Sequence, residues 1–354
     1  MKKILHIFPY EKFTFDYISK IERCFDPSMH SFYVYGKKQS EAIKECRGAI
    51  SKVYFAESVR LGKTIKLIKS FSNYDKIILH SLFLPPTLLI AFSCIIKNIS
   101  SKVFWVIWGA DLYDTYWSKD KNVMHKIREL FRKRFIKYVK AVGYIPSDYM
   151  YLKKCYKTDA KFYLASYSYD FFDIPEKPKE DDTINILVGN SATESCQHTE
   201  AIDLISSLGL KNVKLWCVLS YPQNKSYIEK VALYGKGAFG DRFIPLVDYM
   251  PYENYMEMLS NIDIAIFNNN RQQALGNIAG LLFYGKTVFV NPKNGCLDYF
   301  KRMGATIFST EEFSKELVTK LNYGLKKENQ RIILKFFSDD CFAERWREIF
   351  EGEF

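Results

Sequence analysis

"DFFDIPEKPKEDDTINILVGN" runs from Asp170 to Asn190, near the middle of a chain of 354 residues. Pro175, Pro178 and the charged run 176–182 are typical of a linker, because proline and dense charge interrupt helices and strands. The apolar run after them reads as a buried strand, so a regular pattern begins again at this point. A chain this long exceeds one ordinary core, and the linker therefore predicts two domains.

Both sides of the linker alternate short apolar runs with helix-length segments. The runs are continuously apolar, which is typical of parallel strands buried on both faces. Expected strands before the linker are 4–8, 32–35, 53–55, 76–80, 103–108, 141–145 and 162–165. Expected strands after it are 184–191, 213–219, 243–249, 263–268 and 287–291. The pattern predicts an α/β fold with domains at 1–174 and 183–337, and a C-terminal helix within 338–354.

Neither apolar stretch that resembles a membrane segment is long enough to be one. "MKKILHIFPYEKF" opens the chain with about six apolar residues, fewer than a signal peptide needs, and is expected to form the first strand. "LFLPPTLLIAFSCII" (82–96) falls short of the roughly 20 residues of a transmembrane helix. We therefore expect a chain that does not span a membrane.

Positive charge is concentrated in the first half. Residues 1–180 hold 32 Lys and Arg against 18 Asp and Glu, and the rest of the chain holds 19 against 22. Nucleic acid, an anionic membrane surface or a phosphate-bearing substrate would each suit such a half. The basic segment 125–140, which also carries apolar and aromatic residues, favours the membrane surface, although a solvated helix packed on a sheet is the alternative. No nucleic-acid-binding motif is present, so we expect no nucleic acid partner.

Several familiar motifs are missing from the sequence. The eight cysteines form no C-x-x-C pair, which predicts reduced thiols and neither a zinc site nor a disulfide framework. There is no G-x-G-x-x-G after a first strand, no phosphate-binding P-loop and no D-x-D pair in a loop. We therefore predict that the protein uses no metal and no cofactor.

Polar residues recur where the expected strands end, which is where open α/β sheets bind ligands. In the first domain, Asp111 is the first candidate for a general base and His80 the second. The alternatives are a helix N-cap for Asp111 and a hydrogen-bonded buried histidine for His80. His6 and Glu11 are weaker candidates.

In the second domain, "NNNRQQALGNIAG" (268–280) lies between a strand and a helix, where unpaired N–H groups suit an anion. Arg271 adds a cation for a phosphate, and Gly276 permits close approach of the backbone. The uncharged donors in the stretch are Gln272, Gln273 and Asn277. A solvated strand-to-helix loop is the alternative.

Two further strand ends add candidates in this domain. Asn190 and Ser191 follow the first strand and can form a tight turn whose N–H groups face a diphosphate. Tyr221 and Asn224 follow the second strand and are expected to line a nucleotide or sugar pocket. Ordinary β–α loops are the alternative at both places.

Several motifs in this order resemble one bacterial family. They are "WGADLY" (108–113), "ILVGNS" (186–191) with His198 after it, "YPQNKSYIEKV" (221–231), "RQQALG" (271–276) and "HSLFLPPTLL" (80–89). Together they are similar to the 4-alpha-L-fucosyltransferases, glycosyltransferase family 56.

The resemblance implies a GT-B fold, with two facing Rossmann-like domains and a last helix that crosses back to the first domain. It implies a donor nucleotide in the C-terminal domain and an acceptor in the N-terminal one. It further implies a metal-independent glycosyltransferase that moves a deoxyamino sugar from a TDP-sugar to a polyprenyl-diphosphate-linked or other glycan acceptor. The expected location is peripheral, on the cytoplasmic face of the bacterial inner membrane. A two-domain nucleotide-sugar epimerase and a small-ligand binding protein without catalysis are the alternatives.

Overall fold

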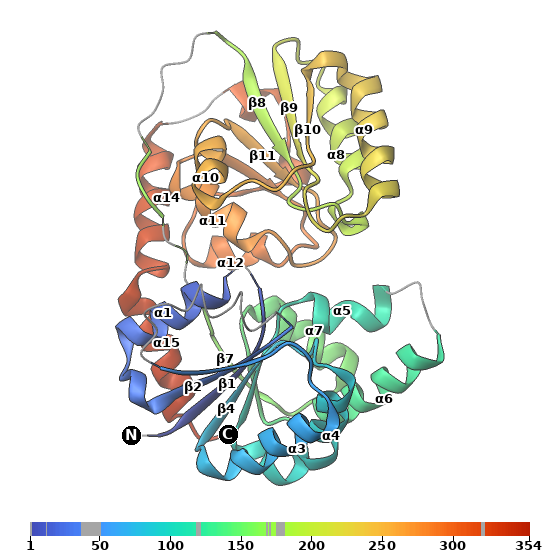
Figure 1. The fold of residues 1–354 in the computed structure, drawn as a ribbon. Helices are drawn as coiled ribbons and strands as arrows, with labels where there is room; N and C mark the ends of the chain where they lie inside the picture. Colours follow the sequence, from blue (N-terminus) through green and yellow to red (C-terminus); the bar gives the residue numbers. More distant parts are fainter. Residues whose placement is uncertain are drawn as a thin grey trace. The chain divides into compact units, whose positions relative to one another are not determined.

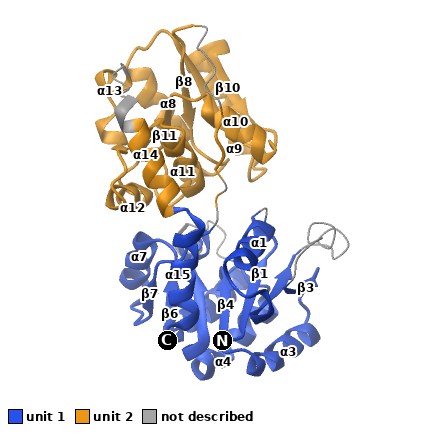
Figure 2. Ribbon diagram, turned by 90° about the vertical axis from the view of Figure 1, so that its left-hand side faces the viewer, with its two compact units in different colours: residues 1–168, 337–354 blue, residues 169–336 orange. Residues whose placement is uncertain are grey.

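Two units, each built around its own sheet, make up the chain in the computed structural model (Figure 2). Unit 1 comprises Met1–Ser168 and Phe337–Phe354, and unit 2 comprises Tyr169–Phe336. The described residues are 2–11, 13–36, 51–117, 122–167, 169, 171–174, 181–319 and 323–354. The expected linker core, 175–180, lies outside them.

Unit 1 contains seven parallel strands in the order β3-β2-β1-β4-β5-β6-β7. They are β1 (Ile4–Pro9), β2 (His30–Tyr35), β3 (Lys52–Ala56), β4 (Lys76–His80), β5 (Val103–Val106), β6 (Ala141–Gly143) and β7 (Lys161–Tyr163). The helices are α1 (Thr14–Cys24), α3 (Leu61–Ser70), α4 (Pro86–Ile99), α5 (Ala110–Trp117), α6 (Val123–Tyr138), α7 (Pro146–Tyr156) and α15 (Asp339–Glu351). The seven strands expected from the apolar runs are confirmed, although β5, β6 and β7 each end two residues before the expected position.

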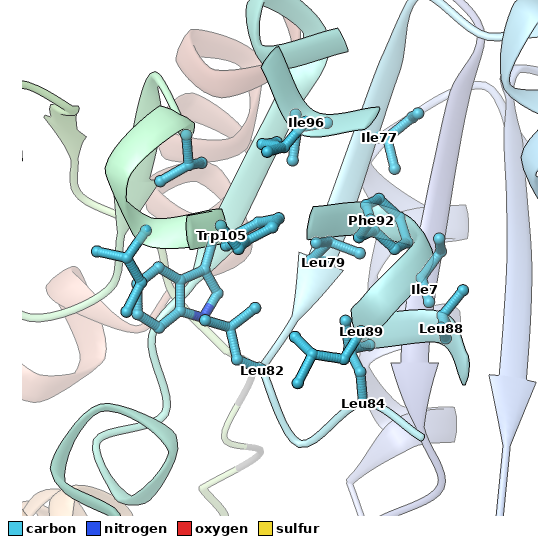
Figure 3. Close-up of a cluster of buried hydrophobic side chains, with 14 of the residues drawn as sticks. Ile7, Ile77, Leu79, Leu82, Leu84, Leu88, Leu89, Phe92, Ile96 and Trp105 are labelled. Atoms are coloured by element: carbon cyan, nitrogen blue, oxygen red, sulfur yellow. The ribbon is translucent and has the colours of Figure 1, made fainter. Parts of the chain in front are cut away.

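Residues of the unit 1 strands point alternately to two different layers. One set packs under α3, α4 and α6, where Trp105 of β5, Leu79 of β4 and Phe92 of α4 are fully buried (Figure 3). The other set, which includes His6 of β1, faces α1 and α15. Burial on both faces explains why these strands read as unbroken apolar runs.

Helix α15 closes the second layer of unit 1. Ser338 caps it by accepting a hydrogen bond of 3.2 Å from the N–H of Cys341. Lys20 of α1 forms an ion pair with Asp339 at its start. Trp346, fully buried, donates its indole N–H to the carbonyl of Ser166 at 2.8 Å. The last helix is therefore part of the core of unit 1.

Unit 2 repeats the same topology with six parallel strands, in the order β10-β9-β8-β11-β12-β13. They are β8 (Ile184–Val188), β9 (Val213–Val218), β10 (Phe243–Leu246), β11 (Ile264–Phe267), β12 (Thr287–Val290) and β13 (Phe308–Ser309). The helices are α8 (His198–Ser207), α9 (Lys225–Phe239), α10 (Tyr252–Ser260), α11 (Leu275–Phe283), α12 (Cys296–Arg302), α13 (Lys315–Thr319) and α14 (Tyr323–Phe336). The two-residue β13 was not expected, because so short a strand has no readable pattern.

The strand orders show one reversal point in each sheet. In unit 1, β2 and β3 lie on one side of β1, and β4 to β7 lie on the other. In unit 2, β9 and β10 lie on one side of β8, and β11 to β13 lie on the other (Figure 1). The strand order therefore reverses between β1 and β4 and between β8 and β11. Loops diverge at such a reversal, and ligands bind there at the carboxyl ends of the strands. The loops after β1, β4, β8 and β11 are therefore the places to look for a site.

Candidate functional site

A network of uncharged side chains joins the loops after β8 and β11 in unit 2. Gln273 is its centre: its Oε1 accepts a hydrogen bond of 2.6 Å from Ser195 and one of 3.2 Å from Nδ2 of Asn269. The same Nδ2 donates to Oδ1 of Asn190 at 3.0 Å. Residues about 80 positions apart in the sequence thus hold each other in place at the reversal point.

Three hydroxyl groups extend this network along the loop after β8. Oγ1 of Thr193 lies 3.1 Å from the hydroxyl oxygens of both Ser191 and Ser195. Nε2 of Gln273 reaches Thr193 at 3.4 Å. These groups can donate or accept hydrogen bonds without adding charge, which suits the hydroxyl and phosphate oxygens of a sugar nucleotide.

The loop after β12 is hydrogen-bonded to the network as well. Nδ2 of Asn294 donates to the carbonyl of Gln273 at 3.2 Å, and its Oδ1 accepts from the N–H of Cys296 at 3.1 Å. Asn294 is fully buried. The strand-end pattern had not singled out Asn294, although it follows the strand "TVFV" as the other loops follow theirs.

Two amide oxygens in the loop after β11 are buried without a hydrogen-bond partner among the described residues. They are Oδ1 of Asn269 and Oδ1 of Asn270. An unpaired buried acceptor destabilises a fold by about 1–3 kcal/mol, and a ligand donor can supply the missing bond. The sequence had left Asn269 open as either a turn residue or a ligand, and its central contacts make it part of the network.

The donor-site residues predicted from the sequence fall into separate environments. Asn190, Ser191 and Gln273 belong to the network. Arg271 lies beside it, half-buried, and its Nη1 donates to the carbonyl of Gln272 at 3.2 Å. The side chain of Gln272 is buried, with Nε2 3.8 Å from Sγ of Cys296. Gln272 therefore supports the loop from inside, which does not fit its predicted role as a ligand donor.

Two other predicted residues of this stretch have packing roles. Nδ2 of Asn277 donates to the hydroxyl of Tyr255 at 3.0 Å, which ties α11 to α10. A Cβ on Gly276 would lie 2.6 Å from the ring of Tyr169. The glycine thus makes room for a ring of unit 2, where the sequence had suggested room for a ligand.

The loop after β9 contributes one neighbour and one helix cap. The carbonyl of Tyr221 accepts a hydrogen bond of 2.6 Å from the N–H of Ala192, so this loop adjoins the hydroxyl loop. Tyr221 is 69% exposed. Oδ1 of Asn224 accepts from the N–H of Tyr227 as the N-cap of α9. Asn224 is therefore accounted for by helix capping.

In unit 1, the carboxylate of Asp111 accepts three hydrogen bonds. Its Oδ2 accepts from the N–H of Leu82 at 2.8 Å and from the indole of Trp105 at 3.0 Å, and its Oδ1 accepts from the N–H of Trp108 at 2.9 Å. Burial raises the pKa of this carboxyl, while the three N–H donors oppose the rise. Asp111 lies in the first turn of α5, and its three bonds to N–H groups give it a structural role that neither the general base nor the helix N-cap had described.

His80, the second candidate, stands at the carboxyl end of β4. Its Nδ1 lies 2.6 Å from the hydroxyl of Tyr167 and its Nε2 lies 3.2 Å from Nδ1 of His6. Burial holds the pKa of His80 well below its usual value, so the ring is neutral at physiological pH. Tyr167 had no signal in the sequence, because it follows a short edge strand in an unpatterned segment.

The basic helix expected at 125–140 is α6, and its exposed apolar residues are aliphatic. Val123, Met124, Ile127 and Leu130 are 70, 66, 41 and 67% exposed. Phe135, one of the aromatic residues of this segment, is fully buried against the sheet. Helical periodicity places 123, 127 and 130 on the outer face and 135 on the inner one.

Two further properties concern membranes and metals. Among the described residues, no helix combines the length and the apolarity that crossing a bilayer requires. Within those same residues, no three His, Cys, Asp or Glu side chains are grouped as metal ligands would be.

Solved structures share this architecture over nearly the whole chain. A glycosyltransferase from Rickettsia africae matches with a TM-score of 0.71 and 14% identity, over 99% of this chain and 98% of the other. Anabaena HepE in complex with UDP matches with a TM-score of 0.69 and 11% identity, over 99% and 100%. Sucrose-phosphate synthase from Thermosynechococcus elongatus matches with a TM-score of 0.68 and 10% identity, over 99% and 98%. At these identities the likeness establishes the GT-B fold.

The family follows from the sequence match. Residues 14–352 fit the model of the 4-alpha-L-fucosyltransferases, glycosyl transferase group 56. The match covers both units and includes the loops after β4, β8 and β11. The chain is therefore a glycosyltransferase and belongs to the 4-alpha-L-fucosyltransferase family, glycosyltransferase group 56.

Proposed function

We propose that this glycosyltransferase moves a deoxyamino sugar from a TDP-sugar to a lipid-linked glycan acceptor on the cytoplasmic face of the bacterial inner membrane. The observation that carries the proposal is the uncharged network around Gln273, in a chain that matches the family from residue 14 to residue 352. Anabaena HepE, of the same fold, was solved with UDP and with UDP-glucose, which supports a nucleotide-sugar donor.

Unit 2 would hold the donor. The chain enters α11 through Ala274, which has a left-handed φ of 66°, and the helix begins at Leu275. The first N–H groups of a helix lack partners within it and favour an anion. Arg271 stands just before this point and would pair with the diphosphate. Negative charge grows on the diphosphate as the bond to the anomeric carbon breaks, so these groups would act most strongly in the transition state.

Unit 1 would receive the acceptor and take the proton of its attacking hydroxyl. We assign that role to the end of β4, because His80 is a neutral base there, whereas Asp111 already accepts three hydrogen bonds from N–H donors. Asp111 instead joins this loop, through Leu82, to the loop after β5, through Trp108. The carboxylate would thereby fix the geometry in which the base works.

The outer surfaces of α3, α4 and α6 suit a lipid-linked acceptor (Figure 1). Besides the four exposed aliphatic residues of α6, Leu61 and Ile65 of α3 and Ile90 of α4 are 65, 47 and 38% exposed. Every residue of these three helices is described, and their one acid, Glu129, is buried in an ion pair with Arg132. Exposed lysines and arginines surround the apolar residues. We propose that this face, the α3–α4–α6 face, rests on an anionic bilayer.

The donor site is tested with Arg271→Ala. We expect turnover to fall by about 10²–10³, the effect of losing one donor that stabilises developing charge. The assay measures transfer of radiolabelled sugar from TDP-, UDP- and GDP-sugars to a polyprenyl-diphosphate saccharide. Binding of each nucleotide by thermal shift identifies the base.

Arg242→Ala is the matched control, since Arg242 is an exposed arginine of unit 2 that donates to the carbonyl of Lys211. Its activity should equal that of the native protein. Full turnover in Arg271→Ala would remove Arg271 from the mechanism. Free or epimerised sugar without transfer to the lipid-linked saccharide would refute the proposed acceptor.

A further inference from the structure

Three buried histidines of unit 1 lie in one line. Nδ1 of His30 is 3.1 Å from Nε2 of His6, and Nδ1 of His6 is 3.2 Å from Nε2 of His80. Nδ1 of His80 is 2.6 Å from the hydroxyl of Tyr167. The line therefore runs from the first residue of β2, across the middle of β1, to the last residue of β4 and beyond.

The order of the nitrogens couples the protons of the three rings. In each contact Nδ1 of one histidine meets Nε2 of the next, and a neutral ring has one N–H and one lone pair. A hydrogen bond needs one of each. If His80 carries its proton on Nε2, His6 must accept on Nδ1 and carry its own on Nε2, and His30 must do likewise. All three rings therefore share one tautomer, either Nε2–H throughout or Nδ1–H throughout.

The tautomer of the three rings decides where the hydroxyl proton of Tyr167 points. The indole N–H of Trp108 can only donate, and it lies 2.7 Å from the Tyr167 oxygen. With the rings in the Nε2–H form, the Tyr167 hydroxyl donates to His80 and its oxygen can accept from elsewhere. With the rings in the Nδ1–H form, the oxygen accepts from His80 and the hydroxyl proton turns to another acceptor.

Only the two end residues of this line have any solvent-exposed surface. His6 and His80 are fully buried, whereas His30 is 3% and Tyr167 is 6% exposed. Aromatic rings enclose the middle: Phe32 and Phe8 stack on His6 and His80, and Trp346 of α15 contacts both histidines. Protons can enter or leave such a line only at its ends.

The rings are neutral under ordinary conditions. Burial lowers the pKa of His6 and His80 well below the usual value, and lowers the pKa of His30 to about 4 although the nearby Asp26 carboxylate opposes the change. Tyr17 of α1, whose hydroxyl lies 3.4 Å from Nδ1 of His6, is a further titratable group beside the line, and burial raises its pKa. A line of neutral rings can shift protons without forming a buried charge.

We propose that His30, His6, His80 and Tyr167 form a proton relay that connects the carboxyl-end edge of the unit 1 sheet with the far end of β2. The role of the relay in transfer rests on the proposed function; the coupling of the tautomers does not. Tyr167 is the end nearest the edge where the acceptor would bind, so Tyr167 and not His80 would contact the acceptor hydroxyl.

One transfer of sugar is accompanied by one shift of protons along the relay. As the acceptor oxygen bonds to the anomeric carbon, the nucleoside diphosphate leaves with the electron pair of the broken C–O bond, and the hydroxyl proton goes to the Tyr167 oxygen. Tyr167 passes its own proton to Nδ1 of His80, His80 passes its Nε2 proton to His6, and His6 passes its Nε2 proton to His30. His30 releases its Nε2 proton to water. Each ring stays neutral and changes tautomer. After the products leave, His30 takes a proton from water, the shift runs in reverse, and Tyr167 releases a proton to water, so that one turnover releases one proton in all.

The tautomers are directly measurable, because the chain has five histidines in all. Long-range proton–nitrogen NMR on the full chain labelled with ¹⁵N-histidine distinguishes Nδ1–H from Nε2–H in each ring. We expect the same tautomer, or the same mixture, at His6, His30 and His80. Opposite tautomers in any two of these rings would overturn the relay, whether or not the protein transfers sugar.

The second arm measures proton delivery with Tyr167→Phe and His6→Phe. We expect kcat to fall about 10²-fold or more in each, the usual contribution of general base catalysis, and the solvent deuterium isotope effect on kcat to change. The donor KM should stay within about twofold, because the donor residues lie in unit 2. Tyr234→Phe in α9, a tyrosine of unit 2 that is 42% exposed and donates to Asp203, should match the native enzyme.

Folding is checked separately, since His6 is buried. If His6→Phe does not fold, His30→Gln interrupts the same line at its exposed end and should reproduce the loss of kcat. Native kcat in Tyr167→Phe, or in a folded variant of His6 or His30, would overturn the relay. If the native chain transfers no sugar from any nucleotide, the proposed function fails, and the NMR result alone decides the relay.

Discussion

Gly189, the residue after β8, lies against His198 at the start of α8: a Cβ on Gly189 would be 2.2 Å from Nε2 of His198. Its φ of +69° is in the left-handed region, where side chains are disfavoured. The glycine therefore sets the turn that leads to Asn190 and Ser191. The glycine of the "ILVGNS" motif is therefore explained by its backbone conformation, and His198, which follows the motif, is explained by its packing against that glycine.

Gly189→Ala should destabilise unit 2 strongly. The left-handed φ costs about 1–2 kcal/mol for alanine, and overlap with a buried ring adds about 1–3 kcal/mol. Gly209→Ala is the matched control, because Gly209 has a φ of +59° and nothing within 4 Å of the added Cβ. Urea unfolding should show the larger loss for Gly189→Ala. Equal losses would mean that the His198 ring moves away without cost.

Asp111→Asn separates a positioning role from a catalytic one. An amide cannot accept at all three positions, so at least one buried N–H loses its partner, and we expect the free energy of unfolding to fall by about 2–3 kcal/mol. Asp298→Asn, in an exposed pair with Arg302, should change it by less than about 1 kcal/mol. A fully stable Asp111→Asn protein without turnover would instead indicate that Asp111 is the base.

Binding to the bilayer should depend on the α3–α4–α6 face. The double variant Ile127→Glu with Leu130→Glu removes two apolar side chains and adds two negative charges, at about 1 kcal/mol per charge near an anionic surface. We expect at least a tenfold lower partition onto phosphatidylglycerol-containing liposomes in a flotation assay. Leu233→Glu in α9, where the leucine is 77% exposed, should bind like the native protein. Unchanged partition of the double variant would refute this face as the contact.

The stability of unit 1 should fall as the pH drops from about 6.5 towards 4. Burial lowers the pKa of His30 to about 4, so between these values the unfolded chain binds a proton that the folded chain does not. Stability therefore rises with pH across this window, by roughly 3 kcal/mol for this one group. Urea unfolding at pH 7, 5.5 and 4.5 should show a smaller acid loss in His30→Gln than in the native protein. The same loss in both would show that folding does not lower the pKa of His30.

The strands were readable because parallel strands buried on both faces form unbroken apolar runs. The ends of those runs pointed to Asn190, Ser191 and Gln273 as candidates, and the structure joins the three in one network because the carboxyl ends of parallel strands meet at one edge of a sheet. The apolar runs do not specify the direction in which each loop side chain points. Gln272 and Gln273 are adjacent in sequence, yet one is buried beside Cys296 and the other joins two loops.

By itself, the sequence determined the two α/β units, the positions of their strand ends and, through its motifs, the family. Only the tertiary structure decided which polar residues meet. His6, His30 and His80 are 24 and 74 residues apart along the chain, and the pairing of β1 with β2 and β4 brings them into line. Apolar periodicity is a local property and can be read along the chain, whereas hydrogen bonds between side chains depend on the register of strands that are distant in sequence.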